Sequence, residues 1–164
     1  MREIIIRPVC PGDIETICGI AVSAWQAIHD GYRIYAGNDD LTERLSRNWQ
    51  AAKARQVRDK AEKCPDMTLV SELNGKIAGF VTFEMNAETG VGEIGNNAVA
   101  PDCQGMGIGS AQYNKVLEIF RLHDMKYAIV TTGYEDEGHA KARASYEKVG
   151  FKKMKTSITY SLKL

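Results

Sequence analysis

Hydrophobic residues recur along this chain with two different spacings, and the spacing predicts which segments form strands and which form helices. Apolar or alternating runs predict strands over residues 3–7, 67–73, 76–85, 91–99, 126–132 and 156–164. Apolar residues three and four positions apart predict helices over residues 14–31, 40–64, 110–120 and 135–148. The resulting order, β-α-α-β-β-β-α-β-α-β, indicates an α/β fold in which one mixed sheet carries helices on both faces.

Glycine and asparagine refine this pattern at two places. Asn74-Gly75 separates two predicted strands and is the strongest hairpin signal in the chain. Gly92 and Gly95 interrupt the predicted strand over residues 91–99. Glycines inside a strand indicate a bulge or the close approach of another backbone, so we expect this strand to be irregular.

The segment over residues 29–40 shows neither spacing, and we expect a loop there after a helix that stops near Gly31. Its polar and aromatic side chains would suit contact with a small ligand, although an ordinary surface loop is the alternative. These side chains are His29, Asp30, Tyr32, Arg33 and Tyr35. A capping box formed by Asp40 and Glu43 is expected to open the next helix. Basic residues concentrate between Lys53 and Lys63, and a solvent-facing helix surface explains them better than a nucleic-acid patch.

Composition narrows the class of protein without identifying it. The chain has 164 residues, of which 44% are hydrophobic and 26% charged, and its formal net charge is zero. We expect one domain over residues 1–164, no nucleic-acid or membrane partner, and a first strand in place of a signal peptide. The four cysteines and three histidines are scattered, so we expect no metal site and no disulfide framework. A cytoplasmic protein is the simplest interpretation.

The stretch from Val99 to Phe120 is the most informative part of the sequence. A predicted strand ends here, Gly105, Gly107 and Gly109 follow, and a helical pattern begins at once. Glycines let backbone N–H groups converge without obstruction by Cβ atoms. The helix N-terminus adds its unpaired N–H groups and the positive end of its dipole. This order therefore predicts an anion site, most naturally for phosphate.

Two common nucleotide-binding motifs do not fit the glycine-rich turn, although a turn that merely needs glycine remains open. A mononucleotide P-loop would need Lys-Ser or Lys-Thr after its last glycine, whereas Ser110-Ala111 follows here. A dinucleotide fingerprint would need G-x-G-x-x-G and an acidic residue at the end of the next strand. That strand ends in Thr131-Thr132.

The same stretch resembles the acetyl-CoA loop of the GNAT superfamily of N-acetyltransferases. Gln104, Gly107 and Gly109 match the loop motif Q/R-x-x-G-x-G/A, while residues 7–13 and 146–151 resemble the start and end of that family's domain. The resemblance implies a single-domain, mixed, mostly antiparallel sheet whose central strands splay apart. It also implies an enzyme that uses acetyl-CoA as cosubstrate, without a metal, to acetylate a primary amine by direct attack in a ternary complex.

The resemblance also implies roles for particular residues of this chain. Glu93 corresponds to the general base of histone-type members, although a sheet-edge glutamate that pairs with a surface lysine is the alternative. Tyr146 corresponds to the acid that protonates the departing thiolate, the alternative being a tyrosine that packs on the sheet. His139 stands where the family usually has asparagine, which leaves its contact open. The implied cofactor-binding residues are Ala98, Val99, Gln104, Gly105, Met106, Gly107, Ile108, Gly109, Ser110, His139, Ala142 and Tyr146.

The acceptor and part of the function remain open at this level. Polyamines, amino acids, antibiotics and peptide amines are all compatible, and we expect their pocket to draw on residues 25–35 and the segment after Thr132. A homodimer is possible, although nothing in the sequence specifies an interface. Two other functions compete: a non-catalytic acyl-CoA-binding or sensor module on the same fold, and a regulator that binds another nucleotide at the glycine-rich turn. The presence of both Glu93 and Tyr146 favours the enzyme.

Overall fold

The computed structural model describes residues 3–134 and 137–164, with only the backbone described over residues 32–36. Its centre is a five-stranded sheet in the order β1-β2-β3-β4-β5, antiparallel from β1 to β4 and parallel between β4 and β5. The strands are β1 (Ile4–Pro8), β2 (Thr68–Leu73), β3 (Lys76–Asn86), β4 (Val91–Val99) and β5 (Tyr127–Val130). The helices are α1 (Ile14–Ala36), α2 (Asp39–Ser46), α3 (Trp49–Lys63), α4 (Ile108–Leu122) and α5 (Ala140–Lys148).

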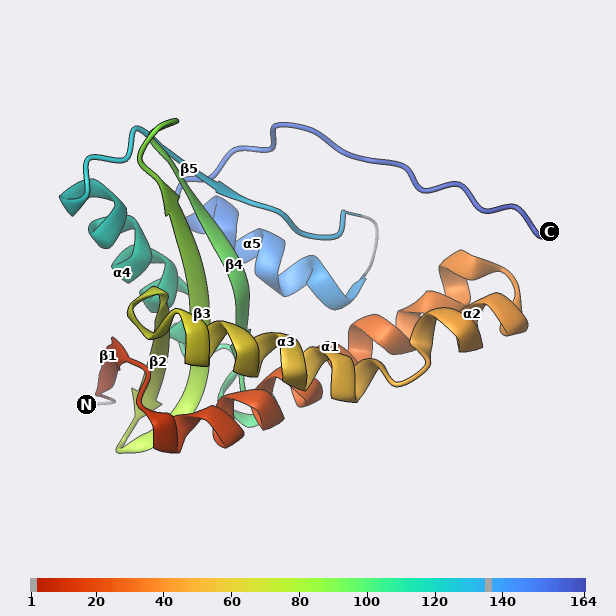
Figure 1. Cartoon of the computed structure of the whole chain (residues 1–164), viewed down its shortest axis with the longest axis horizontal. Helices are drawn as coiled ribbons and strands as arrows, with labels where there is room; N and C mark the ends of the chain where they lie inside the picture. Colours follow the sequence, from red (N-terminus) through yellow and green to blue (C-terminus); the bar gives the residue numbers. More distant parts are fainter. Residues whose placement is uncertain (1–2, 135–136) are drawn as a thin grey trace.

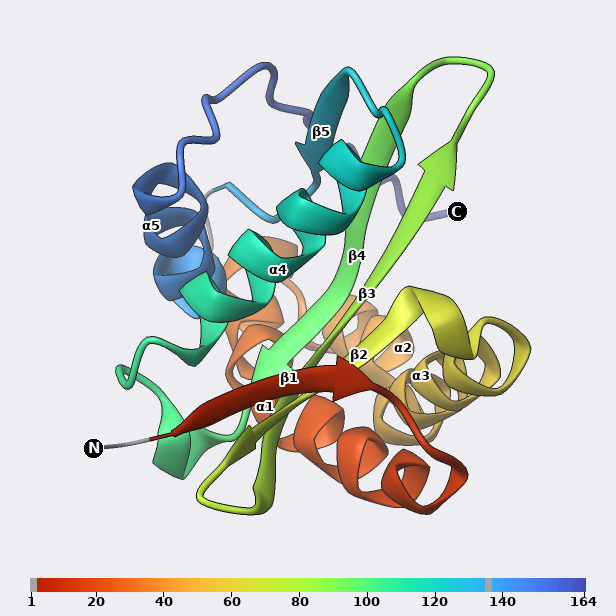
Figure 2. The same ribbon diagram turned by 90° about the vertical axis from the view of Figure 1, so that its left-hand side faces the viewer.

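Helices cover both faces of the sheet, as the sequence predicts (Figures 1 and 2). Helices α1 and α3 pack on one face, where Ile17, Val57 and Phe80 belong to one buried cluster. Helices α4 and α5 pack on the other face, where Phe83 and Phe120 belong to a second cluster. Alternate residues of β3 supply the two clusters, because successive side chains of a strand point to opposite faces. The two cores therefore share the central strands, which fixes the strands relative to both helical layers.

The predicted hairpin is confirmed. Asn74 and Gly75 adopt φ angles of 52° and 78°, the left-handed values that a two-residue hairpin turn requires. Residues 91–99 form β4 within the predicted bounds, while β5 is shorter than the predicted 126–132. Of the helix predicted over residues 135–148, residues 135 and 136 lie outside the described part, Glu137–His139 form a short 3-10 turn, and α5 confirms the rest.

Three predictions in the N-terminal half are wrong in detail. Helix α1 continues through Gly31 and ends at Ala36, so most of the expected loop over residues 29–40 is helical. Gly37 has a φ of 58° and forms the left-handed end of the helix, whereas a glycine within a helix costs only about 1 kcal/mol. Asn38, not Asp40, caps α2 by accepting a hydrogen bond from the backbone N–H of Leu41. The expected side-chain cluster includes residues 32, 33 and 35, which lie outside the described side chains.

The second predicted helix is two helices. Helix α2 ends at Ser46, and α3 begins at Trp49 after Asn48 adopts a left-handed φ of 58°. Asparagine tolerates this conformation better than most residues, which allows the turn. The change of direction brings Trp49 into the protein, where it is buried and stacks on His29 at 4.0 Å between ring centroids.

The predicted last strand is absent. Residues 151–164 have no regular secondary structure, and most of their apolar side chains are exposed. Ile158, Tyr160 and Leu162 are 77%, 88% and 84% exposed. Figure 1 shows this segment passing β5 and ending away from the sheet. Alternation gives a segment the pattern of a strand, but a strand also needs a paired neighbour, and none of the described strands pairs with this one.

Candidate active site

Strand β4 is bulged where the sequence places glycine. Thr82 of β3 faces two residues of β4, Gly95 and Asn96, because the register shifts at this point. A Cβ atom on Gly95 would lie 2.7 Å from Thr82 Oγ1, so the close approach requires glycine. The parallel pairing of β4 with β5 reaches only Ile94 and Val130. Beyond this point β4 borders a gap in the sheet, and the predicted bulge and splay of the central strands are both confirmed.

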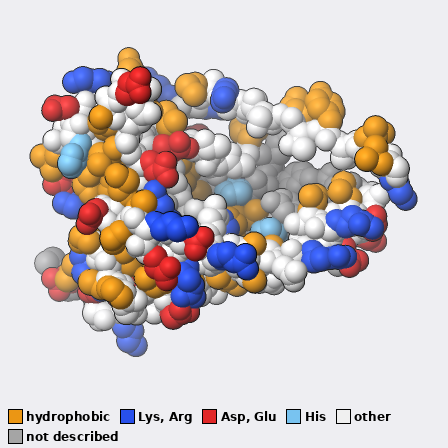
Figure 3. Space-filling model, viewed as in Figure 1, with side chains coloured by type: hydrophobic (Ala, Val, Ile, Leu, Met, Phe, Trp, Pro, Cys, Tyr) orange, Lys and Arg blue, Asp and Glu red, His pale blue; other side chains and the backbone are white. Residues whose placement is uncertain are grey.

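A cavity of about 740 Å3 occupies this gap and is lined from both sides of the sheet. Trp25 and Lys53 contribute from the α1 and α3 side, whereas Tyr113 and Tyr146 contribute from the α4 and α5 side. Figure 3 shows the molecule hollowed between its C-terminal segment and the helices α1–α3. The predicted site residues that line the cavity are Glu93, Ala98, Val99, Gln104, Gly105, Gly107, Ile108, Gly109, Ser110, His139, Ala142 and Tyr146. Met106 was also predicted and does not line it.

The glycine-rich turn forms one end of this cavity. Gly105 and Gly107 have φ angles of 77° and 87°, and Gly107 is the residue before the first turn of α4. No atom lies within 4 Å of a Cβ built on either glycine, so the surface above the turn is open. Positive φ angles and a helix N-terminus orient successive N–H groups to one side, which suits a phosphate. The local geometry therefore fits the anion site predicted from the sequence.

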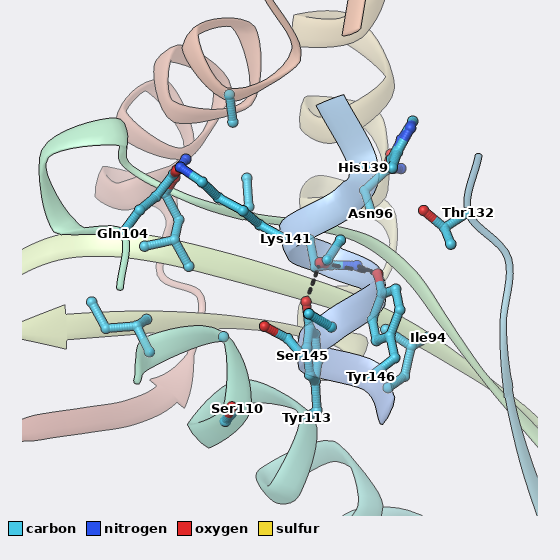
Figure 4. A pocket seen from close by; sticks show the side chains of 18 of the residues that line it. Ile94, Asn96, Gln104, Ser110, Tyr113, Thr132, His139, Lys141, Ser145 and Tyr146 are labelled. Atoms are coloured by element: carbon cyan, nitrogen blue, oxygen red, sulfur yellow. Dashed lines mark hydrogen bonds between the residues drawn. The ribbon is translucent and has the colours of Figure 1, made fainter. Parts of the chain in front are cut away.

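Lysine adds positive charge next to this turn. Lys141 Nζ donates a 2.9 Å hydrogen bond to Gln104 Oε1, which joins α5 to the glycine-rich turn. Lys141 also lines the cavity, and Figure 4 shows its side chain reaching toward Gln104. The sequence pattern does not single out this lysine, because 37 residues separate it from Gln104 and only the packing of α5 brings it there.

Side-chain amides hold the end of β4 beside the gap. Gln112 of α4 is fully buried, and its Nε2 donates to Ala98 O at 3.3 Å and to Ser71 Oγ at 3.0 Å. Gln104 Nε2 donates to Val99 O at 3.4 Å. The Ala98 carbonyl shares a peptide group with the Val99 N–H, and the Val99 carbonyl shares one with the Ala100 N–H, which donates to Ala78 O at 2.8 Å. The peptide group that carries the Val99 N–H is thus held in place beside the gap.

A tyrosine–asparagine network lies on the α4 and α5 side of the gap (Figure 4). Tyr113 OH donates to Asn97 Oδ1 at 2.8 Å, and Asn97 Nδ2 donates to Tyr146 OH at 2.9 Å and to Gly95 O at 3.0 Å. The Gly95 carbonyl can only accept, so it fixes the Asn97 NH2 group toward Tyr146. Tyr146 OH approaches Asn97 Oδ1 at only 3.4 Å, a weaker bond than the one from Tyr113. The Tyr146 proton can therefore turn toward the cavity.

Burial keeps both phenols neutral. Tyr113 and Tyr146 are 3% and 6% exposed, and their ring centroids lie 4.8 Å apart. Loss of solvation raises the pKa of Tyr146, which its hydrogen bonds to Asn97 and Tyr113 offset only in part. Burial also raises the pKa of Tyr113 well above its ordinary value. Tyr146 is consequently a protonated hydrogen-bond donor throughout the physiological pH range.

Glu93 lies on the opposite side of the sheet from Tyr146. Its neighbour Ile94 is buried in the α4 and α5 core, and alternation places Glu93 on the face that carries α1 and α3. It is exposed, lines the cavity, and sits one residue before the pairing of β4 with β5 ends. Glu84, its cross-strand neighbour, forms an ion pair with Lys60 at 2.8 Å. Glu93 forms no ion pair with any residue in the described part of the chain, so the alternative of a glutamate bound to a surface lysine loses support.

The remaining residues predicted to bind the cofactor lie on and before α5. Ala142 lines the cavity from the first turns of this helix, and His139 lines it from the residue just before. Figure 4 shows His139 near Asn96 and Thr132, on the far side of the cavity from Gln104. The imidazole thus lies at the end of the cavity opposite the glycine-rich turn.

For one wall of the cavity, the sequence predicted the segments that would form it but not the individual residues. Trp25 and Ile28 of α1 and Thr132 line it, within or next to the segments expected to form an acceptor pocket. Lys53 lines it as well, which corrects the expectation that the basic stretch of this helix simply faces solvent. Helix α3 packs on α1 and the sheet, so its inward side carries Lys53 between Trp25 and Asn96.

The described part of the chain contains neither a candidate membrane-spanning helix nor a cluster of metal-binding side chains. No helix over residues 3–134 and 137–164 is long and apolar enough to cross a membrane. In the same ranges no three histidine, cysteine or acidic side chains converge as a metal site would require.

Comparison with known proteins shows which family the chain belongs to. A model of the acetyltransferase (GNAT) family matches residues 25–151. An uncharacterized N-acetyltransferase of Methanocaldococcus jannaschii is 34% identical over 91 residues, covering 52% of this chain and 39% of that protein. The chain spans less than half the length of the curated relatives it matches.

Solved structures agree on the fold. The PaiA N-acetyltransferase of Thermoplasma acidophilum, in complex with coenzyme A, superposes with a TM-score of 0.70 at 18% identity, with 94% of this chain and 93% of that chain covered. A GNAT family acetyltransferase of Brucella melitensis, in complex with acetyl-CoA, gives 0.61 at 20% identity, with 93% and 85% covered. The predicted α/β fold is confirmed, and the chain belongs to the acetyltransferase (GNAT) family.

Proposed function

We propose that this chain transfers the acetyl group of acetyl-CoA to a primary amine by direct attack, with both substrates bound at once. The observation that supports this most is the single cavity that runs through the gap beside β4. Its glycine-rich end fits a pyrophosphate, and its lining continues to Trp25, Lys53 and Glu93 on the other face. Two substrates entering from opposite faces would meet beside the bulge, so no covalent relay through the protein is needed.

Glu93 is proposed as the base. An amine with an ordinary pKa of about 10.4 is almost entirely protonated at pH 7 and cannot attack until it loses a proton. Glu93 lies on the α1 and α3 face at the closed end of the gap, where it can accept that proton through a water molecule. Because the side chain is exposed, the proton can pass on to solvent.

Val99 and Tyr146 are proposed to act on the thioester. The N–H group of Val99 is expected to polarise its carbonyl, because Gln112 holds the peptide group that carries it through the bond to Ala98 O. Ala98 pairs with Phe80, and Ala100 N–H donates to Ala78 O, so the alternation of the ladder turns the Ala98 N–H toward β3 and leaves Ala98 to line the cavity. Tyr146 is expected to donate a hydrogen bond to sulfur as negative charge develops there. Its raised pKa makes full proton transfer to a thiolate of pKa about 8.5 less favourable than for an ordinary phenol, so a strong hydrogen bond carries much of the effect.

The pyrophosphate is proposed to bind residues 104–110 with help from Lys141. The open surface above Gly105 and Gly107 and the start of α4 provide N–H donors, and Lys141 provides a charge. His139 and Ala142 would contact the cofactor from α5, with His139 in the place of the family's usual asparagine. Met106 lies in this segment but does not line the cavity, so no contact with the cofactor is proposed for it.

The proposal is tested by release of free thiol from acetyl-CoA in the presence of a panel of primary amines, with mass spectrometry of the products. We expect thiol release to require one class of amine and to yield an equal amount of N-acetylated product. Binding of acetyl-CoA without transfer to any amine of the panel would instead favour the acyl-CoA sensor. Competition by ATP for the same site would favour the nucleotide-binding regulator.

A further inference from the structure

Lys53 places a positive charge on the wall of the cavity that α1 and α3 form, where we propose that the acceptor binds. It lies on α3, lines the cavity, and holds its ammonium group 4.2 Å from the centroid of the Trp25 ring. Its Nζ donates to Asn96 Oδ1 at 3.1 Å and to Gln56 Oε1 at 2.8 Å. An ammonium has three N–H donors, so these two neutral acceptors leave one donor for another group.

The charge of Lys53 has no anionic partner in the described part of the chain. The other basic residues near it on α3 include three that do: Arg58 pairs with Glu15, Lys60 with Glu84 and Lys63 with Asp59. Burial lowers the pKa of Lys53, which shows that its charged form is poorly solvated there. Its charge also contributes to the lowered pKa of His29 on the neighbouring helix. An anion bound at this wall would stabilise the charged lysine.

Glu93 and Lys53 place opposite charges on this wall of the cavity. Asn96, which holds Lys53, and Glu93 lie three residues apart on β4, and Lys53 and Glu93 line the same cavity. An α-amino acid can direct its carboxylate to Lys53 and its amine toward Glu93, with a water molecule between the amine and Glu93. A polyamine would place a second ammonium near Lys53, where like charges repel.

We propose that Lys53 binds a carboxylate of the acceptor, so that the acceptors are small primary amines of the amino-acid type, with the carboxylate close to the amine. This inference rests on the proposed function and names the substrate class of the same site. Lys53 is a specificity-determining residue in this scheme. Trp25 would contact the acceptor side chain, and Asn96 and Gln56 keep the ammonium in place.

The test compares matched acceptors and matched variants. For wild type we expect kcat/KM to be higher for α-amino acids than for their carboxamides or the corresponding decarboxylated amines. Lys53→Met keeps most of the length of the side chain on Trp25 and removes the charge, so this preference should fall about 10- to 100-fold, mainly through the KM of the acceptor. The Kd of acetyl-CoA should not change.

Two further variants keep the test decisive. Lys63→Met removes a charge from the same helix outside the cavity and should leave the preference intact. Lys53→Arg retains the charge and should restore much of the preference even if Lys53→Met folds poorly. A wild-type enzyme that acetylates diamines or carboxamides as well as amino acids would overturn the inference while the proposed function stands. An unchanged preference in Lys53→Met would do the same. Failure of the wild type to acetylate any amine would overturn both.

Discussion

The two walls of the cavity are built in different ways. On the wall proposed to bind the cofactor, the glycine-rich turn, the start of α4 and the end of β4 come from one continuous stretch, residues 97–113. On the wall proposed to bind the acceptor, Trp25, Lys53 and Glu93 come from α1, α3 and β4. A phosphate is recognised largely by backbone N–H groups, which a short local motif can orient. An acceptor is recognised by side chains, and only the packing of several elements brings these together.

The two walls also differ in the groups to which their side chains are bonded. Tyr146 and Asn97 are held by other protein groups, with donor and acceptor directions fixed by the carbonyl of Gly95 and the phenol of Tyr113. Glu93 and Lys53 have no ion-pair partner among the described residues, although Lys53 has neutral ones. The proposed cofactor wall is thus held by hydrogen bonds within the protein, whereas the charges of the proposed acceptor wall are not neutralised by the described residues, as a substrate site would need. The following experiments test this difference, beginning with the largest expected effect.

Replacement of Glu93 tests the acceptor wall most directly. Glu93→Gln keeps the shape of the side chain and removes its basic site. We expect kcat to fall by roughly 10²- to 10⁴-fold, as for loss of a general base. The Kd of acetyl-CoA measured by calorimetry should change little, because Glu93 lies on the other face of the sheet.

Glu84→Gln is the matched control for Glu93. It lies directly across on β3 and does not line this cavity, so its kcat should stay near wild type. Turnover of Glu93→Gln close to wild type at neutral pH would mean that another group is the base or that the amine arrives already neutral.

Removal of the Tyr146 hydroxyl tests the cofactor wall. Tyr146→Phe keeps the ring packed against Tyr113 and Phe151. We expect kcat to fall by about 10- to 100-fold, the value of a hydrogen bond to a charged group, with little change in cofactor Kd. The deficit should shrink with an acyl donor whose leaving thiol is more acidic. A loss of activity that arises only from weaker cofactor binding would reduce Tyr146 to a packing residue.

The glycine-rich turn is tested by Gly107→Val. This change strains a φ of 87° and places a branched side chain where the phosphates should approach. We expect the Kd of acetyl-CoA to rise by at least about 10-fold, because several N–H contacts are lost together. Gly75→Val carries a similar backbone strain, at a φ of 78°, in the distant β2–β3 hairpin. It should lower stability without changing this Kd, and equal effects of the two variants on Kd would contradict the assignment.

The smallest expected effect concerns Tyr113, which orients Asn97 and does not itself touch the substrates in the proposed mechanism. Tyr113→Phe removes the donor to Asn97 Oδ1 and should lower kcat several-fold by freeing the Asn97 amide. It should cost about 1 kcal/mol of unfolding free energy in urea titrations. In the double variant with Tyr146→Phe the kcat effects should not add, because both changes act on one hydrogen-bond network. Fully additive effects would separate Tyr113 from the function of Tyr146.

Much of the fold and one wall of the site can be predicted from the sequence. The α/β class, the Asn74-Gly75 hairpin and the bulge near Gly95 follow from local backbone requirements, and the structure confirms them. The glycine-rich turn and the tyrosine before Gly150 are recognisable for the same reason, since each lies within one short motif. All predicted site residues except Met106 line one cavity, and their roles remain predictions.

Tertiary structure alone decided what depends on contacts between distant segments. Two glycines could end α1, and packing extends the helix past Gly31 to Ala36, just before Gly37. The alternating C-terminal segment has the pattern of a strand, but no described strand pairs with it. Lys53 belongs to a basic stretch that looks solvent-facing, and only the docking of α3 on α1 and β4 turns it toward Trp25 and Asn96. Periodicity and turn residues act over a few positions of the chain, whereas the acceptor wall depends on side chains that only the packed sheet and helices bring together.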